Sequence, residues 1–233
     1  MIFAIDHIVF GVSPEQSRRL RAKLVRAGFT PEPFALEFPE IGAASESVSF
    51  AGGGFIEFVA AFDESLAPPI WFADIPRVIG LGFSSDDFDA DTNWSAETGA
   101  WVMNEDHRLP DGSRLSIHAA GPHAHFSEFY AFVMDRPDGH LQFPERKAGP
   151  RLRSLSFAGE TADLWRERFS EWFRLPSAAG SLAVGDVELR FEHRREPGIR
   201  VTPRFNGASR SESVELTTGS IELVASAKTP ITG

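Results

Sequence analysis

The stretch Ser47–Ala60 reads SVSFAGGGFIEFVA and predicts a β-hairpin. Two apolar runs flank a triple glycine, and glycine supplies the positive φ that tight hairpin turns require. The second run places one carboxylate, Glu57, among Phe and Ile side chains. A charge inside a buried strand is costly unless it is paired, protonated or bound to a cation. Glu57 is therefore the first candidate for a functional residue.

The same pattern returns near the other end of the chain, where Ser213–Ala225 reads SVELTTGSIELVA. Both stretches begin with Ser-Val, turn at glycine, and end in Ile-Glu, one apolar residue and Val-Ala. Glu222 stands where the first copy has Glu57. We therefore expect a structural unit that occurs more than once.

The residues before the first hairpin complete such a unit. Residues 2–12 are rich in β-formers and predict a strand, and Ser13-Pro14 supplies an N-cap and a first helical residue for a helix that ends near Gly28. Residues 29–38 predict a strand that two prolines confine to a sheet edge. The order is β-α-β-β-β.

Two further units follow the first. The second unit begins with strand-like sequence at Arg77, after a linker. The third unit begins with strand-like sequence after Pro150, which is followed by a helix over 160–174 and a strand over 187–191. We expect the repeated hairpin to close this third unit. We predict an α+β fold of repeated βαβββ modules that form curved mixed sheets. Residues 1–148 would hold two modules (about 1–63 and 75–145), and 149–233 the third.

Composition narrows the class of protein. The formal net charge of −10 argues against nucleic acid or an anionic membrane as partner, and the absence of cysteine excludes disulfides and thiolate ligands. No apolar run is long enough to span a membrane and no signal peptide is visible, so we expect a cytoplasmic protein. The 21 Phe against one Tyr indicate apolar packing or an apolar pocket.

The chain resembles the glyoxalase-like domain proteins of the vicinal oxygen chelate superfamily, which includes glyoxalases, extradiol dioxygenases and bleomycin-resistance proteins. The resemblance rests on the order of several motifs: IDHIVFGV at 5–12, RAGFT at 26–30, GFIEFV at 54–59, GLGFSSDD at 80–87, LPDG at 109–112 and FYAF at 129–132. It implies curved sheets of paired modules with a small-molecule site in the concave face, and a homodimer.

The resemblance also implies metal ligands. In the metal-using members, one module gives a His from its first strand and a Glu from its last, which here are His7 and Glu57. Imidazole nitrogen and carboxylate oxygen suit Mn, Fe, Ni or Zn. The other modules depart from this pattern. Gly80 and Ser154 stand at the His7 position of modules two and three. The expected last strand of module two, His140–Phe143, has no carboxylate.

Two functional hypotheses stay open. The first is a metal-dependent lyase, isomerase or dioxygenase acting on a small oxygen-rich or aromatic compound, with His7 and Glu57 as ligands, Glu57 as a catalytic base, and His118 or Glu222 completing the site. His118 is the first choice because it shares the polar face of its strand with Arg114 and Ser116. The second is a metal-free protein that binds a small apolar molecule in a Phe-lined cavity.

Overall fold

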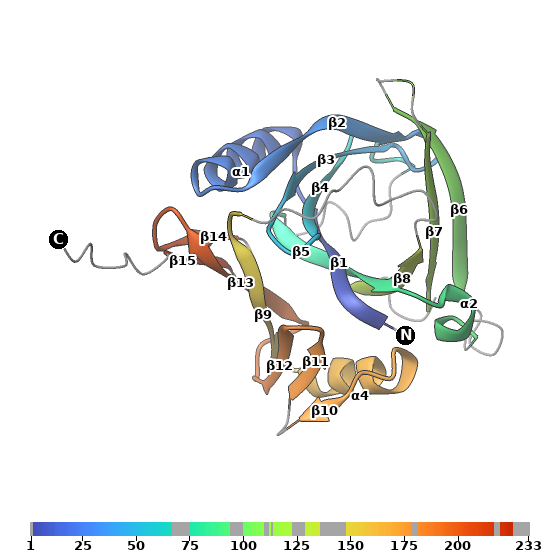
Figure 1. Cartoon of the computed structure of the whole chain (residues 1–233). Helices are drawn as coiled ribbons and strands as arrows, with labels where there is room; N and C mark the ends of the chain where they lie inside the picture. The colour runs from blue at the N-terminus through green and yellow to red at the C-terminus, as the bar shows by residue number, and fades with distance from the viewer. Residues whose placement is uncertain are drawn as a thin grey trace.

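The chain folds into two β-sheets that share one core (Figure 1). The computed structural model describes residues 2–66, 75–93, 100–109, 112, 114–122, 129–135, 148–178, 181–216 and 220–225. The first sheet has eight strands in the order β2-β3-β4-β1-β5-β8-β7-β6, and the second has seven in the order β10-β11-β12-β9-β13-β15-β14.

The first module forms as the sequence predicts. Its elements are β1 (Ile2–Gly11), α1 (Pro14–Arg26), β2 (Thr30–Phe38), β3 (Ala43–Ser49) and β4 (Phe55–Ala61), with a 3-10 turn at Pro39–Ile41. A capping box starts α1: the Ser13 hydroxyl accepts from the Gln16 N–H, and the Gln16 side chain accepts from the Ser13 N–H. β3 and β4 are the predicted hairpin, with Gly52 and Gly53 at positive φ in its turn.

The second module repeats the first and pairs with it. It consists of β5 (Arg77–Ser85), α2 (Phe88–Asp91), β6 (Trp101–Arg108), β7 (Arg114–Gly121) and β8 (Tyr130–Asp135). β1 and β5 run antiparallel at the centre, and each is flanked by the last strand of its own module in parallel. The sheet curls so far that its two edges meet, with the rings of Phe38 on β2 and His107 on β6 5.6 Å apart (Figure 1).

One predicted strand of module two falls on residues that the structure does not describe. The predicted last strand at His140–Phe143 lies outside the described residues, and β8 already closes the module, parallel to β5. β6 is a strand that was not predicted, and its side chains alternate between half-buried and exposed, as in a strand with one face inward.

The third module is complete without the repeated hairpin. Its elements are β9 (Arg151–Gly159), α4 (Ala162–Trp172), β10 (Ser177–Ala178), β11 (Ser181–Val184) and β12 (Val187–His193), and β12 lies parallel to β9. The hairpin of β14 (Glu212–Glu215) and β15 (Ser220–Ala225) instead pairs with β13 (Arg200–Ala208). The expectation that the hairpin closes module three is therefore wrong: it belongs to a partial fourth module, β13-β14-β15, in which β13 runs antiparallel to β9 as β5 does to β1.

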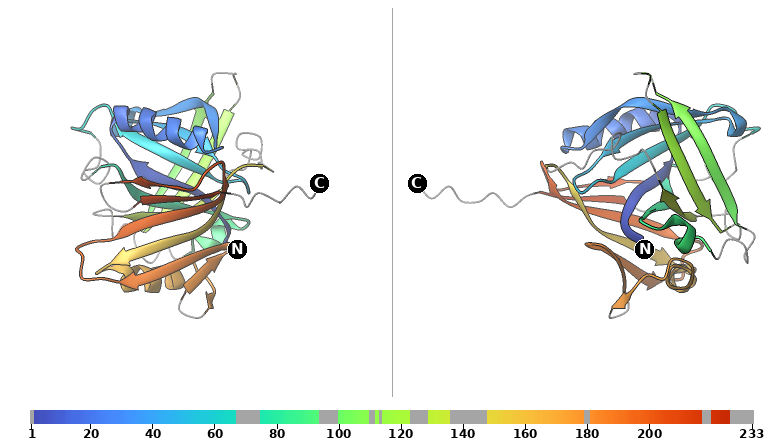
Figure 2. Two further views of the ribbon diagram at one scale, coloured as in Figure 1. Left: turned by 90° about the vertical axis from the view of Figure 1, so that its left-hand side faces the viewer. Right: turned by 45° about the vertical axis from the view of Figure 1, so that its right-hand side comes forward.

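The two sheets pack through their helix-bearing sides (Figure 2). Phe83 of β5 contacts Phe169 of α4 with ring centroids 5.6 Å apart, and Phe129 meets Trp165 of the same helix at 5.0 Å. One cluster of buried side chains joins strands of both sheets with α1 and α4. The inner face of the first sheet carries a second, separate apolar cluster. None of the described helices has both the length and the apolarity needed to cross a membrane.

Candidate functional site

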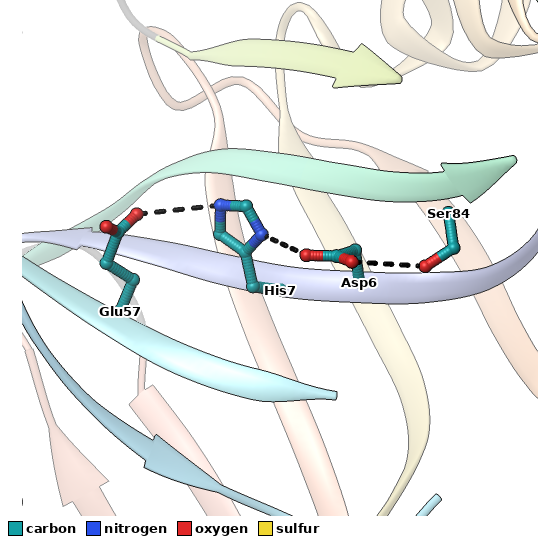
Figure 3. Close-up of polar contacts among 4 residues, drawn as sticks. All are labelled: Asp6, His7, Glu57 and Ser84. Atoms are coloured by element: carbon teal, nitrogen blue, oxygen red, sulfur yellow. Dashed lines mark hydrogen bonds and ion pairs between the residues drawn. The ribbon is translucent and has the colours of Figure 1, made fainter. Parts of the chain in front are cut away.

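A β-bulge in β1 brings two acid–base side chains together. Ile5 pairs with Phe83 and His7 with Gly82, so Asp6 is an extra residue that has no counterpart on β5. Neighbouring residues of a regular strand point to opposite faces, and a bulge breaks that alternation. As a result His7 Nδ1 lies 2.6 Å from Asp6 Oδ1, and both residues are buried (Figure 3).

The contacts on both sides of the imidazole define its orientation. The Ser84 hydroxyl donates to Asp6 Oδ2 at 3.2 Å, and in the tautomer that carries its proton on Nδ1, His7 donates to Asp6 Oδ1. His7 Nε2 then faces Glu57 Oε2 across 3.5 Å (Figure 3). Ser84, Asp6, His7 and Glu57 thus form a continuous line from β5 through β1 to β4.

The ring of His7 is held on its faces and edges by neighbours. It stacks on Phe55 with centroids 4.6 Å apart and planes 15° apart, and Phe132 approaches it edge-on at 5.2 Å. Gly82 leaves the space that the ring occupies, because a Cβ there would lie 2.8 Å from His7 Cε1. The close approach of β5 to the imidazole therefore requires glycine at this position.

His7 and Glu57 open into a cavity of about 220 Å³ on the concave face of the first sheet. Its walls are mostly apolar and aromatic. They are formed by His7, Leu36, Phe38, Ile41, Ser47, Phe55, Glu57, Val59, Trp101, Met103, Leu115, Ile117, Tyr130, Phe132 and Met134. Ligand sites in proteins are commonly cavities of this kind, apolar with a few convergent polar groups.

Tyr130, the single tyrosine of the chain, lies in the same wall. Burial raises the pKa of its phenol well above the usual value, and the negative charge of Glu57 raises it further. Tyr130 therefore stays neutral at physiological pH and can donate a hydrogen bond toward the cavity.

The strand registers show what module two offers at the positions of His7 and Glu57. In module one, His7 pairs with Phe55 and Val9 with Glu57; in module two, Gly80 pairs with Tyr130 and Gly82 with Phe132. With Gly80 at the His7 position, Phe132 stands at the position of Glu57.

The donor set does not fit a catalytic metal site. Such sites usually provide three protein ligands, and module two contributes a glycine and a phenylalanine where ligands would be expected. Within the described residues, no group of three or more His, Cys, Asp or Glu side chains is arranged to hold a metal ion. His7 and Glu57 remain as two donors side by side.

The structure does not bring His118 or Glu222 to this site. On β7, Leu115 and Ile117 face the cavity, whereas His118 lies on the other face with its Nδ1 3.9 Å from Asp135. Glu222 lies in the second sheet, opposite Arg204 in register, and is exposed. The polar face of β7 is thus the outer one.

Sequence reasoning missed two residues of the site. Asp6 precedes His7 directly, and only the bulge turns it to the same side; a β-strand pattern predicts the opposite. Tyr130 could have been found, because a lone tyrosine in a chain with 21 phenylalanines carries a hydroxyl where the rest of the aromatic set does not.

No family model and no curated protein matches this sequence. Among solved structures, a hypothetical protein from Staphylococcus aureus is similar with a TM-score of 0.70 at 9% identity, over 97% of this chain and 100% of that one. A mutant of 4-hydroxymandelate synthase from Streptomyces coelicolor gives 0.55 at 14% identity, over 88% and 71% of the two chains. A fusion of a xylose isomerase-like TIM barrel with 4-hydroxyphenylpyruvate dioxygenase gives 0.55 at 12% identity, over 88% of this chain and 36% of that one. At these identities the likeness concerns the fold.

Proposed function

We propose that this chain, which has the glyoxalase-like fold of the vicinal oxygen chelate superfamily, binds a small apolar or aromatic molecule in the concave cavity of its first sheet, without a metal ion. The resemblance expected from the motif order is confirmed at the level of the fold. The function rests on one observation: the cavity is built from apolar and aromatic side chains around a single His–Glu pair.

Several features of the site support binding without metal. The cavity is lined from both modules, so a ligand there would contact β2, β4 and β6–β8 at once. His7 is already held by Asp6, Phe55 and Gly82 before any ligand arrives. Preorganised polar groups in an apolar pocket give orientation and specificity at little entropic cost.

A thermal-shift screen tests this proposal. We expect small aromatic compounds to raise the melting temperature of the metal-free protein, because a ligand that binds only the folded state stabilises it. Val59→Phe, which fills part of the cavity, should abolish the shift. Val102→Phe is the matched control, since Val102 is 58% exposed on β6 and points away from the cavity. No shift with any aromatic compound, or an undiminished shift in Val59→Phe, would contradict the proposal.

A second candidate is a metal-dependent enzyme. The observation in its favour is the 3.5 Å separation of His7 Nε2 and Glu57 Oε2, with Nδ1 held by a carboxylate as is usual for metal-bound histidines. Here His7 and Glu57 would have to be completed by water or substrate oxygens. The proposal assigns no reaction step to such an ion.

Metal analysis decides between the two candidates. Purified protein should contain no stoichiometric Mn, Fe, Ni or Zn after incubation with each ion and removal of the excess. His7→Ala and Glu57→Ala serve as background controls, because they remove the two donors. A stoichiometric metal in the wild type that both variants lose would replace the first candidate with the second.

A further inference from the structure

The cavity is asymmetric in charge. Glu57 gives it a carboxylate, and among the described residues no Lys or Arg lines it. Glu105 lies on the same face of β6, two residues beyond Met103 of the cavity wall, but it is paired with His107, whose Nε2 lies 3.0 Å from its carboxylate, so Glu57 is the acidic group that faces the ligand. A carboxylate or phosphate ligand would meet a like charge and no cationic side chain, which is unfavourable in an apolar environment.

The polar end of the cavity places two groups that can accept a hydrogen bond, His7 Nε2 and Glu57 Oε2, side by side. His7 Nε2 and Glu57 Oε2 lie 3.5 Å apart there, while Nδ1 of the same ring lies 2.6 Å from Asp6 Oδ1. Two acceptors at this separation are stabilised by a proton on Nε2 or by a donor from a ligand. An ammonium group carries several N–H donors and a positive charge, so it can serve both acceptors.

The remaining walls suit a cation as well. Aromatic rings line the cavity from four different strands: Phe38, Phe55, Trp101, Tyr130 and Phe132. Tyr130 and Phe132 are stacked with centroids 5.5 Å apart, and Trp101 lies 5.7 Å from Phe132. The faces of aromatic rings carry negative potential and attract organic cations, most strongly where water is excluded.

We propose, building on the function proposed above, that the ligand is a small organic cation: an amine whose ammonium group lies against Glu57 and His7 while its apolar part occupies the aromatic walls. Glu57 is the counter-ion, and the rings of Phe132 and Trp101 solvate the charge. The cavity therefore selects by charge as well as by size.

Three probes of nearly equal shape test the charge preference at neutral pH: benzylamine, benzyl alcohol and benzoate. Calorimetric titration of the metal-free protein should show benzylamine binding at least about tenfold tighter than benzyl alcohol, with benzoate the weakest. Glu57→Gln should reduce the affinity for benzylamine several-fold more than the affinity for benzyl alcohol, because only the ammonium group loses a counter-ion. Glu222→Gln, the same change on an exposed strand of the second sheet, should alter neither.

A second variant separates the aromatic contribution from that of Glu57. Phe132→Leu keeps an apolar side chain but removes one aromatic ring. It should therefore reduce the affinity for benzylamine several-fold more than the affinity for benzyl alcohol. If benzyl alcohol or benzoate binds the wild type as tightly as benzylamine, the cation proposal is overturned while small-molecule binding in the cavity stands. If none of the three binds, both proposals fail.

Discussion

Single side chains decide the chemistry of the concave site. Asp6 Oδ1 lies 2.6 Å from His7 Nδ1 and Asp6 is itself held by Ser84, so the imidazole presents Nε2 to the cavity. Phe55 and Phe132 leave the ring little room to turn. The ring plane of His7 is thus set by residues outside the His–Glu pair.

Tyr130 offers a direct measurement of the cavity environment. Its pKa is raised by burial and by the charge of Glu57, so phenolate absorbance in the folded protein should appear only well above pH 10, whereas the denatured chain should titrate near 10. No other tyrosine interferes, because the chain has one. Glu57→Gln should move the folded-state titration to lower pH. A folded-state titration near pH 10 would contradict the buried position of the phenol.

The same pKa shift predicts a loss of stability at high pH. Below pH 10 the phenol is protonated in the folded and the unfolded chain alike, and it contributes no pH dependence. Above pH 10 only the unfolded chain ionises, so the free energy of unfolding should fall by up to about 1.4 kcal/mol per pH unit at this residue. Denaturant unfolding of wild type and Tyr130→Phe at a series of alkaline pH values should show the steeper decline in the wild type. Equal slopes would contradict this origin.

Substitution of Gly82 tests whether the close packing of β5 against the His7 imidazole matters. In Gly82→Ala the new Cβ would lie within 2.9 Å of both His7 Cε1 and Nδ1, so the ring or the strand must shift. Overpacking of this kind typically costs about 1–3 kcal/mol. We expect reduced stability in denaturant unfolding and weaker ligand binding, whereas Asn104→Ala on the exposed face of β6 should leave both unchanged. Wild-type binding by Gly82→Ala would show that the position of His7 is unimportant.

At the scale of elements, α4 fastens the second sheet to the first. Its buried face carries Trp165 and Phe169, and Phe169 contacts Phe83 of the first sheet as well as Phe157 of the second. Phe169→Ala should lower the free energy of unfolding by about 3–5 kcal/mol, because it leaves a cavity between the sheets. Leu164→Ala in the same helix should cost less than about 0.5 kcal/mol, since Leu164 is 42% exposed. Equal costs in denaturant titrations would refute this role of α4.

Local signals made individual elements predictable. The Ser13–Gln16 capping box, the glycine turn at 52–54 and the edge prolines of β2 each act within a few residues, and the structure has α1, the β3–β4 hairpin and an edge strand β2 at these places. The strand with which the β14–β15 hairpin pairs could not be predicted from such local signals. Which strand it joins depends on pairing with β13, and the sequence analysis had not predicted a strand there.

The face that a strand turns inward was equally hard to predict. Alternation along β7 separates Leu115 and Ile117 from Ser116 and His118, but it does not say which side is concave. The polar face of β7 was expected to line the concave side, whereas the cavity there is mostly apolar and its polar groups come from β1, β3, β4 and β8. His7 and Glu57 were implied by the resemblance, and their 3.5 Å contact agrees with that pairing.

On the scale of the whole molecule, the two sheets share a single core. Buried side chains of β1, α1, α4 and the second sheet form one cluster, so unfolding of either sheet exposes apolar side chains of the other. We therefore expect one cooperative transition. Unfolding curves from tryptophan fluorescence and far-ultraviolet circular dichroism should coincide. Two separated transitions would show that the sheets fold as independent units.

Among the described residues of the second sheet, the face that corresponds to the concave site has a different character. The helix-free face of that sheet carries exposed Arg190, Arg204 and Glu222, with Ser154 among them in register. It is lined by charged side chains, whereas the corresponding face of the first sheet encloses the cavity. The second sheet therefore contributes stability to the first sheet through the shared core.

The bulge at Asp6 makes that residue dispensable to the pairing of the strand. Ile5 and Ile8 are three positions apart and would point to opposite faces of a regular strand, yet both face the shared core. They can do so because Asp6 is an extra residue with no pairing partner on β5. Deleting the Asp6 codon would thus leave every other side chain of β1 on its present face, whereas deleting His7 or Ile8 would not. Insertions and deletions are usually ruinous within a central strand. Here a single-residue deletion would preserve the sheet and remove only the support of the imidazole.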